Sequence, residues 1–162
     1  GPTIMSGYYM EGEADDYGLY TDENGVKWVL SGDLGYEDEE GFFHFSGRKK
    51  RLILIAGYNV YPTDIEKVVG DLPYIKDCCA VQGYNEAGKP LVRLYASLFE
   101  NGDEEKYKEE ICELCLKNFS KYYVPRDIIF LEDLPQTPLM KIDFMKLTKA
   151  DANKARETRK VD

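Results

Sequence analysis

The chain has 162 residues, of which 43% are apolar and 31% are charged, the composition of a folded globular protein rather than a disordered one. At roughly 150 residues per domain, this length allows one domain, or one domain and part of another. Acidic residues outnumber basic residues 30 to 21, and the net charge of -9 argues against a general nucleic-acid binder, which presents a basic surface. The longest apolar run, Leu52–Ala56, is far shorter than the roughly 20 residues of a membrane-spanning helix. Because the chain begins at Gly1 rather than at a methionine, we expect a piece of a longer protein.

The four cysteines of the chain form two pairs, Cys78 beside Cys79 and Cys112 three residues before Cys115. A Cys-x-x-Cys pair can be redox-active or form half of a zinc site. Here that pair lies in a helical pattern, and the chain has a single histidine, His44. We therefore expect free buried thiols in a reducing cytoplasm, and no metal site.

Residues 1–48 have the pattern of a β-rich segment with two hairpins. The stretch Thr21–Gly25 ends in Asn-Gly, a strong signal for a hairpin turn, and Lys27–Leu30 follows it as a short strand. The acidic turn Glu37–Gly41 lies between two segments rich in aromatic residues and predicts the second hairpin.

Strands and helices alternate after residue 50, which predicts a small α+β unit. Pro62 suits the first turn of a helix that Pro73 stops, and Asp103 suits the N-cap of a second helix that runs to about Phe119. Apolar and polar residues alternate along Leu91–Phe99, which predicts a strand with one buried face. Further strands are expected at residues 52–56, 78–84 and 128–131, and a further helix from residue 143.

Two polar features allow nucleotide chemistry. Asp33 follows Gly32 directly after a strand, and a carboxylate in such a place can accept hydrogen bonds from the hydroxyls of a ribose. An ordinary turn aspartate has the same local sequence. The four bases Arg48–Arg51 suit a phosphate-binding cluster, but a solvated charged turn suits them equally.

Two further features concern the backbone and a lone cation. Gly57 follows an apolar strand, where a glycine allows either the close approach of a ligand or a turn with positive φ. Lys141 lies between Met140 and Ile142 after a loop with two prolines. A lysine there can be aimed at an anion, or it can extend to water past its apolar neighbours.

Four segments together, in their order along the chain, indicate more than any of them alone. They are Gly1–Tyr9; Ser31–Tyr36 with Asp38, Gly41 and Phe42; Gly47–Ile53 with Gly57, Asn59, Val60, Pro62, Ile65 and Glu66; and Leu134–Asp143. In this order they resemble the C-terminal part of the adenylate-forming enzymes, which include acyl-CoA synthetases, luciferases and carrier-protein adenylation domains. The Gly-Tyr-Asn-Val-Tyr-Pro of residues 57–62 is similar to the version in fatty acyl-CoA ligases. Met140 departs from the pattern, because the family has glycine at that position.

The resemblance implies an α+β fold with three parts. Residues 1–48 would end the large adenylation domain, residues 49–147 would form the small C-terminal lid domain, and residues 148–162 would be a charged helical or disordered tail. In this family the glycine-rich phosphate loop, the adenine pocket and the acyl pocket lie upstream of the segment that Gly1–Tyr9 resembles. We therefore expect the chain alone to be inactive and to bind no cofactor tightly, and its partner to be the rest of the large domain.

The resemblance implies that the parent enzyme activates a carboxylic acid with ATP and transfers it to coenzyme A, with Mg²⁺ as the metal. The similarity of residues 57–62 to fatty acyl-CoA ligases favours a fatty acid as the substrate. The implied site residues act on the nucleotide, the hinge and the coenzyme A passage: Lys141 as the catalytic cation, Asp33 and Arg48 at the nucleotide, Lys50 as the hinge, and Ala56, Gly57 and Tyr58 at the pantetheine passage. Two alternatives stay open: an adenylation domain that loads a carrier-protein thiol, and a non-catalytic binding module with the same fold.

Overall fold

A computed structural model describes residues 18–100 and 102–150 of the chain. The chain divides into two units, Gly1–Lys50 and Arg51–Asp162. This division lies next to Lys50, to which the family resemblance assigns the hinge. The first of the four family-like segments, residues 1–9, and most of the predicted tail lie outside the described residues.

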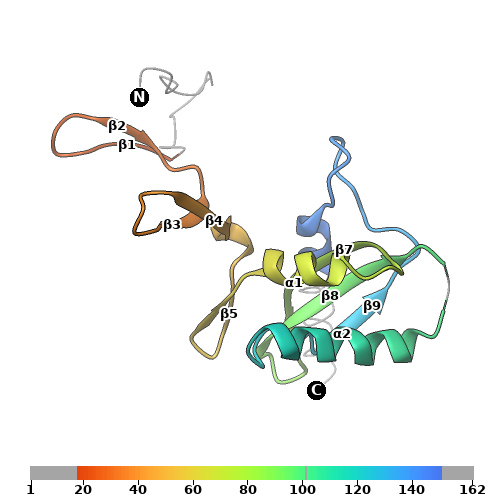
Figure 1. Cartoon of the computed structure of the whole chain (residues 1–162). Helices are drawn as coiled ribbons and strands as arrows, with labels where there is room; N and C mark the ends of the chain where they lie inside the picture. Colours follow the sequence, from red (N-terminus) through yellow and green to blue (C-terminus); the bar gives the residue numbers. More distant parts are fainter. Residues whose placement is uncertain (1–17, 101, 151–162) are drawn as a thin grey trace. The chain divides into compact units, whose positions relative to one another are not determined.

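The first unit contains two antiparallel hairpins (Figure 1). Strand β1 (Leu19–Thr21) pairs with β2 (Lys27–Val29), and β3 (Asp33–Glu37) pairs with β4 (Phe43–Arg48). Both predicted hairpins are thus confirmed. The second hairpin has an irregular register after Leu34, and Gly35 is required there, because a Cβ atom at this position would lie 2.5 Å from the carbonyl oxygen of His44.

The second unit is built on a three-stranded sheet of order β7-β8-β9. Strand β7 (Ile75–Tyr84) is antiparallel to β8 (Pro90–Leu98), which is parallel to β9 (Asp127–Phe130). A short helix η1 (Lys49–Arg51) at the boundary of the units and a hairpin of β5 (Ile53–Ile55) and β6 (Tyr58–Val60) precede this sheet in the chain. The mixed sheet with its helices confirms the predicted α+β class, whereas strand β6 was not predicted.

Two helices cover one face of this sheet. Helix α1 (Pro62–Gly70) has proline in its first turn, and helix α2 (Glu104–Asn118) is capped by Asp103, whose carboxylate accepts a hydrogen bond from the Lys106 amide at 3.2 Å. Their inward side chains share one core with the alternate residues of β8: Ile65, Val69, Ile111 and Cys115 from the helices and Val92, Leu94 and Ala96 from the strand. Both predicted helices are therefore confirmed.

The other face of the sheet is also covered, which corrects one prediction. Tyr95 and Ser97 lie on the face of β8 that was expected to be open, yet they are only 5% and 0% exposed. The segment after β9 returns over this face, and Leu134 and Leu147 pack there with Cys79, Val81 and Tyr95. The alternation of residues along β8 predicts only one buried face. Tyr95 lies at a position that the alternation assigns to the polar face, yet its ring packs against Leu134 and Leu147 in the second core.

The residues after this returning segment form a final helix within the described part of the chain. Residues 144–150 are helical, as predicted. Among the described residues, no helix is both long enough and apolar enough to cross a membrane.

Candidate functional site

Asp33 and Arg48 lie opposite each other at the open end of the β3–β4 hairpin. Their side chains form an ion pair with 2.7 Å between Arg48 Nη1 and Asp33 Oδ1, and Arg48 Nη1 also donates to the Ser31 carbonyl oxygen at 3.2 Å. Both side chains remain accessible, at 37% for Asp33 and 58% for Arg48. The hairpin register thus brings together two residues that lie 15 positions apart and that the sequence assigns to one nucleotide.

The turn before Asp33 fixes the direction of its side chain. Gly32 has a φ of +76°, in the left-handed region that favours glycine, and its carbonyl oxygen accepts a hydrogen bond from the Lys49 amide at 2.8 Å. The Ser31 hydroxyl accepts a hydrogen bond from the Asp33 amide at 3.2 Å. The Ser-Gly-Asp sequence therefore builds a small turn that presents a carboxylate beside a guanidinium.

The run of four bases does not form one cluster. Arg48 pairs with Asp33, whereas Arg51 forms an ion pair with Glu66 and is only 17% exposed in its side chain. Lys49 and Lys50, between them, are exposed on η1. Neither sequence interpretation, a phosphate cluster or a solvated turn, holds for the whole run, because Arg51 is used inside the second unit.

Arg51 and Glu66 form a half-buried network that the sequence analysis missed. Arg51 Nη1 donates to Glu66 Oε2 at 3.1 Å, and Arg51 Nη2 donates to Glu66 Oε1. The same groups bind the backbone of β7, since Arg51 Nη2 lies 3.3 Å from the Ala80 carbonyl oxygen and the Ala80 amide donates to Glu66 Oε1 at 2.9 Å. The local sequence signals for this pair are a base directly before the expected strand 52–56 and an acid in the first helix of the second unit. Both residues also belong to the third family-like segment.

Ala56 and Gly57 form the two-residue turn between β5 and β6. Their φ angles are +50° and +85°, as a tight hairpin turn with two left-handed residues requires. A Cβ atom at Gly57 would meet nothing within 4 Å among the described residues. Tyr58 follows the turn and stacks on Tyr122 with 4.3 Å between ring centroids, which holds the hairpin against the loop after α2.

Lys141 lies on another hairpin of the second unit, which follows β9 and is closed by a bridge between Gln136 and Ile142. The Thr137 amide donates to the Lys141 carbonyl oxygen at 2.7 Å, and the Lys141 amide approaches Thr137 Oγ1 at 3.3 Å. Lys141 is exposed, and so are its neighbours Leu139 and Met140, at 79% and 77%. The loop therefore presents an ammonium group at the edge of the second unit on a backbone that several hydrogen bonds hold.

Met140 has a φ of +58°, which is uncommon for a residue with a side chain. Its amide donates to the Thr137 carbonyl oxygen at 2.9 Å and closes the turn that leads to Lys141. Glycine adopts this conformation with no steric penalty, which explains why a glycine suits the position that Met140 occupies. Met140 thus holds a backbone conformation that a glycine at this position would adopt freely.

The hairpin of β5 and β6 and the hairpin that follows β9 lie apart on the second unit (Figure 1). The Lys141 hairpin follows β9, whereas the Gly57 hairpin precedes α1. The predicted site residues Lys141 and Gly57 therefore lie on two separate hairpins of the second unit.

The four cysteines are free thiols. Burial raises the pKa of Cys78 and of Cys79 to about 12, and the charge of Glu66 adds to both shifts. Burial also raises the pKa of Cys115 to about 11. Within residues 18–100 and 102–150, no group of three or more His, Cys, Asp or Glu side chains could hold a metal ion.

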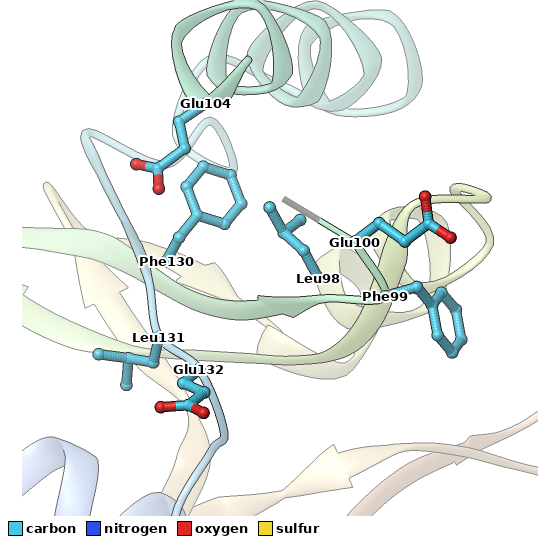
Figure 2. Close-up of a pocket in the computed structure, with 7 residues that line it drawn as sticks. All are labelled: Leu98, Phe99, Glu100, Glu104, Phe130, Leu131 and Glu132. Atoms are coloured by element: carbon cyan, nitrogen blue, oxygen red, sulfur yellow. The ribbon is translucent and has the colours of Figure 1, made fainter. Parts of the chain in front are cut away.

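A pocket of about 510 Å³ lies elsewhere on the second unit, where β8 and β9 end and α2 begins (Figure 2). Glu100, Glu104 and Glu132 line it together with apolar side chains. Three carboxylates around one pocket repel a phosphate group. None of the predicted site residues lines this pocket, which therefore has no part in the candidate nucleotide site.

Comparison with known proteins identifies the second unit. Residues 64–141 match the model of the AMP-binding enzyme C-terminal domain. The chain is 32% identical to a long-chain-fatty-acid–CoA ligase of Escherichia coli O6:H1 over 142 residues, which are 88% of this chain and 24% of that protein. It is also 32% identical to a 2-succinylbenzoate–CoA ligase of Listeria monocytogenes over 147 residues, which are 91% of this chain and 30% of that protein.

A solved structure agrees with these relatives. The o-succinylbenzoate CoA synthetase of Bacillus subtilis, in complex with its acyl-adenylate intermediate, matches with a TM-score of 0.75 and 26% identity, over 91% of this chain and 28% of that one. The chain thus spans only 24% to 30% of the length of these proteins. Its family-like segments, its α+β fold and its relatives agree, and the chain contains the C-terminal domain of an adenylate-forming enzyme of the acyl-CoA ligase family.

Proposed function

We propose that this chain is the C-terminal part of an ATP-dependent ligase that converts a fatty acid into its acyl-CoA thioester. The observation that carries the proposal is that Lys141 lies on one hairpin of the second unit and Gly57 on another. A lid with two separate loops suits two successive reactions at one nucleotide, because a rotation of the lid would exchange one loop for the other. Lid motions gate many enzymes in this way.

In the first reaction, a carboxylate oxygen of the acid attacks the α-phosphorus of ATP, and the bond from that phosphorus to the pyrophosphate oxygen breaks. Negative charge grows on the phosphorus oxygens, where a positioned cation stabilises the transition state. Lys141 is the proposed cation. Asp33 would accept hydrogen bonds from the ribose hydroxyls, and Arg48, paired with Asp33 at 2.7 Å, would assist at the ribose or the phosphates.

In the second reaction, the thiol sulfur of coenzyme A attacks the acyl carbon, the proton of the thiol is lost, and AMP leaves with the bridging oxygen. Rotation of the lid at Lys50 would withdraw Lys141 and bring the turn Ala56–Gly57 and Tyr58 to the nucleotide. The open space around the Gly57 Cβ position supports this role, because no described side chain fills it. A pantetheine arm could then pass close to the backbone.

The partner of the first unit is the remainder of the large adenylation domain in this proposal. Support comes from the aromatic side chains of its hairpins, since Phe43 is 83% exposed and Phe42, Phe45 and Tyr36 each exceed half exposure. Apolar surface on this scale marks an interaction site. A cytoplasmic location is proposed on the basis of the free thiols, which persist in a reducing compartment.

ATP, coenzyme A and Mg²⁺ belong to the complete enzyme in this proposal. The described residues do not fit a metal site of their own, so no step is assigned to Mg²⁺. The fatty acid is proposed from the similarity of residues 57–62 to fatty acyl-CoA ligases, and a relative named for long-chain fatty acids supports it.

The test uses the full-length protein that contains this chain. Exchange of radioactive pyrophosphate into ATP is measured with fatty acids of increasing length and with 2-succinylbenzoate as the competing acid. Coenzyme A and a pantetheinylated carrier protein then compete for the acyl-adenylate. Exchange with fatty acids and transfer to coenzyme A support the proposal, whereas exchange with 2-succinylbenzoate alone, or transfer to the carrier protein alone, contradicts it.

A further inference from the structure

Arg51 is the first residue of the second unit and directly follows the proposed hinge residue Lys50. Its guanidinium is held on three sides: by the carboxylate of Glu66 on α1, by the carbonyl oxygen of Ala80 on β7, and by the ring of Phe144, whose centroid lies 5.2 Å from Arg51 Cζ. The hydrogen bonds and charge of Glu66 outweigh the burial of the guanidinium and raise the pKa of Arg51. Arg51 is therefore a fixed point at the edge of the hinge.

Phe144 connects this fixed point to Lys141, three residues earlier in the chain. Ile142 and Phe144 both pack against the second core, which includes Leu134 and Leu147. Between them, the Asp143 amide donates to the Pro135 carbonyl oxygen at 2.7 Å, and the Asp143 carboxylate accepts from the Lys146 amide at 3.1 Å. The base of the Lys141 hairpin is thus held by a short stretch that ends at the Phe144 ring.

We propose that Arg51 is a positioning residue that couples the hinge to the Lys141 hairpin through the ring of Phe144. The inference rests on the proposed function, because it assigns Arg51 a role in adenylation by Lys141. Arg51 does not touch the reacting atoms. It makes the lid rigid from the hinge to the hairpin, so that rotation at the exposed residues Lys49 and Lys50 moves Lys141 as part of one body.

The cation–π contact is the element of this coupling that can be removed alone. Arg51→Met would leave the half-buried carboxylate of Glu66 without its counter-charge and would put folding at risk. Phe144→Leu keeps an apolar side chain in the second core and removes only the aromatic face. Phe144→Tyr restores that face, and Ile129→Val is the matched control, because Ile129 packs against the same core from β9.

The experiment measures both half-reactions in the full-length enzyme: pyrophosphate exchange for adenylation, and thioester formation from preformed acyl-adenylate. Phe144→Leu should lower the turnover rate of adenylation by about three- to tenfold, the size expected for one partly buried cation–π contact. Its thioester rate should equal that of the parent. Phe144→Tyr should recover adenylation, and Ile129→Val should change neither rate.

Lys141→Ala serves as the reference for the proposed function. Suppose that Lys141→Ala loses adenylation. If Phe144→Leu then keeps the parental adenylation rate, or if Phe144→Leu slows both half-reactions equally, the role of Arg51 is refuted and the proposed function stands. If Phe144→Tyr fails to recover adenylation, the aromatic face is not the coupling element and the inference is again refuted. If Lys141→Ala keeps the parental adenylation rate, the proposed function and the role of Arg51 both fail.

Discussion

The carboxylates of Asp22 and Asp38 occupy equivalent places in successive hairpins and make matching hydrogen bonds. Asp22 Oδ1 accepts from the amides of Asn24 and Val26, and Asp22 Oδ2 accepts from Trp28 Nε1 at 2.8 Å. Asp38 Oδ1 accepts from the amides two and four residues later, and its Oδ2 lies 2.5 Å from the ring nitrogen of His44. Each hairpin is therefore closed by an aspartate that joins its turn to an aromatic ring six residues later.

The first prediction concerns the Asp22 hairpin, which contains the only tryptophan of the chain. The hydrogen bond from Trp28 and two backbone amides lower the pKa of Asp22 below its ordinary value of 3.8. A lowered carboxyl pKa stabilises the folded hairpin above the unfolded pKa, and this contribution is lost as the pH falls through the folded pKa. Tryptophan fluorescence should therefore change with a midpoint below pH 3.8.

The matched variants are Asp22→Ala and Asp38→Ala. Asp22→Ala should alter the emission of Trp28 at neutral pH and abolish the acid transition, because the indole loses its acceptor. Asp38→Ala should leave both unchanged, since its carboxylate contacts His44 instead. An acid transition that survives in Asp22→Ala would refute the assignment.

The second prediction concerns Met140→Gly. A residue with a side chain in the left-handed conformation destabilises the folded state by about 1–2 kcal/mol, and glycine removes this strain. Glycine also loses more backbone entropy on folding, which offsets part of the gain in stability, so we expect a net stabilisation of about 0.5–1 kcal/mol. Met140 is 77% exposed, so little packing is lost. Chemical unfolding of the chain measures the change.

Leu139→Gly is the control for Met140→Gly. Leu139 is similarly exposed, at 79%, but it does not have a positive φ. This variant should be neutral or destabilised, because glycine there gains no relief of strain. Equal effects at the two positions would contradict the explanation from backbone conformation.

The third prediction concerns the ion pair of Arg51 and Glu66. Glu66→Gln should destabilise the chain by about 3 kcal/mol, near the lower end for buried pairs, because it leaves a half-buried guanidinium without a counter-charge. The double variant Arg51→Met with Glu66→Gln removes both charges and keeps an acceptor for the Ala80 amide. It should cost less than the sum of the single variants in a double-mutant cycle, and strict additivity would contradict the network.

The fourth prediction concerns thiol reactivity. Because burial raises the pKa of Cys78 and Cys79 from 9.0 to about 12, the thiolate fraction at neutral pH is lower by about a thousandfold. Alkylation of the folded chain by iodoacetamide, followed by mass spectrometry, should label these two residues far more slowly than the same residues in denaturant. Rapid labelling of Cys79 in the folded chain would contradict its burial.

Much of the fold could be predicted because local signals and the tertiary structure agree. Asn24-Gly25, Pro62 and Asp103 mark their turn or helix start in the sequence and in the structure. The second covered face of β8 could not be predicted, because the partners of Tyr95 come from residues 134 and 147, far along the chain.

The candidate site shows the same limit. The association of Asp33 with Arg48 follows from the hairpin, whereas the partner of Arg51 depends on how α1 packs on β7. The family resemblance gives Arg48 and Lys50 separate roles, but only the tertiary packing shows that Arg51 pairs with Glu66. The assignments of Asp33, Arg48, Lys50, Gly57 and Lys141 to catalytic steps remain predictions.

The most direct test of the central claim compares Lys141→Ala with Gly57→Leu in both half-reactions of the full-length enzyme. Lys141→Ala should lower adenylation by about 10²–10³, the usual cost of one transition-state contact, and leave thioester formation from preformed acyl-adenylate intact. Gly57→Leu should do the opposite, since its side chain has free space in the lid but would obstruct the pantetheine arm. Gly57→Ala controls for the positive φ. Opposite losses in the two variants are the predicted result, and equal losses of both half-reactions in both variants would contradict a lid with two functional loops.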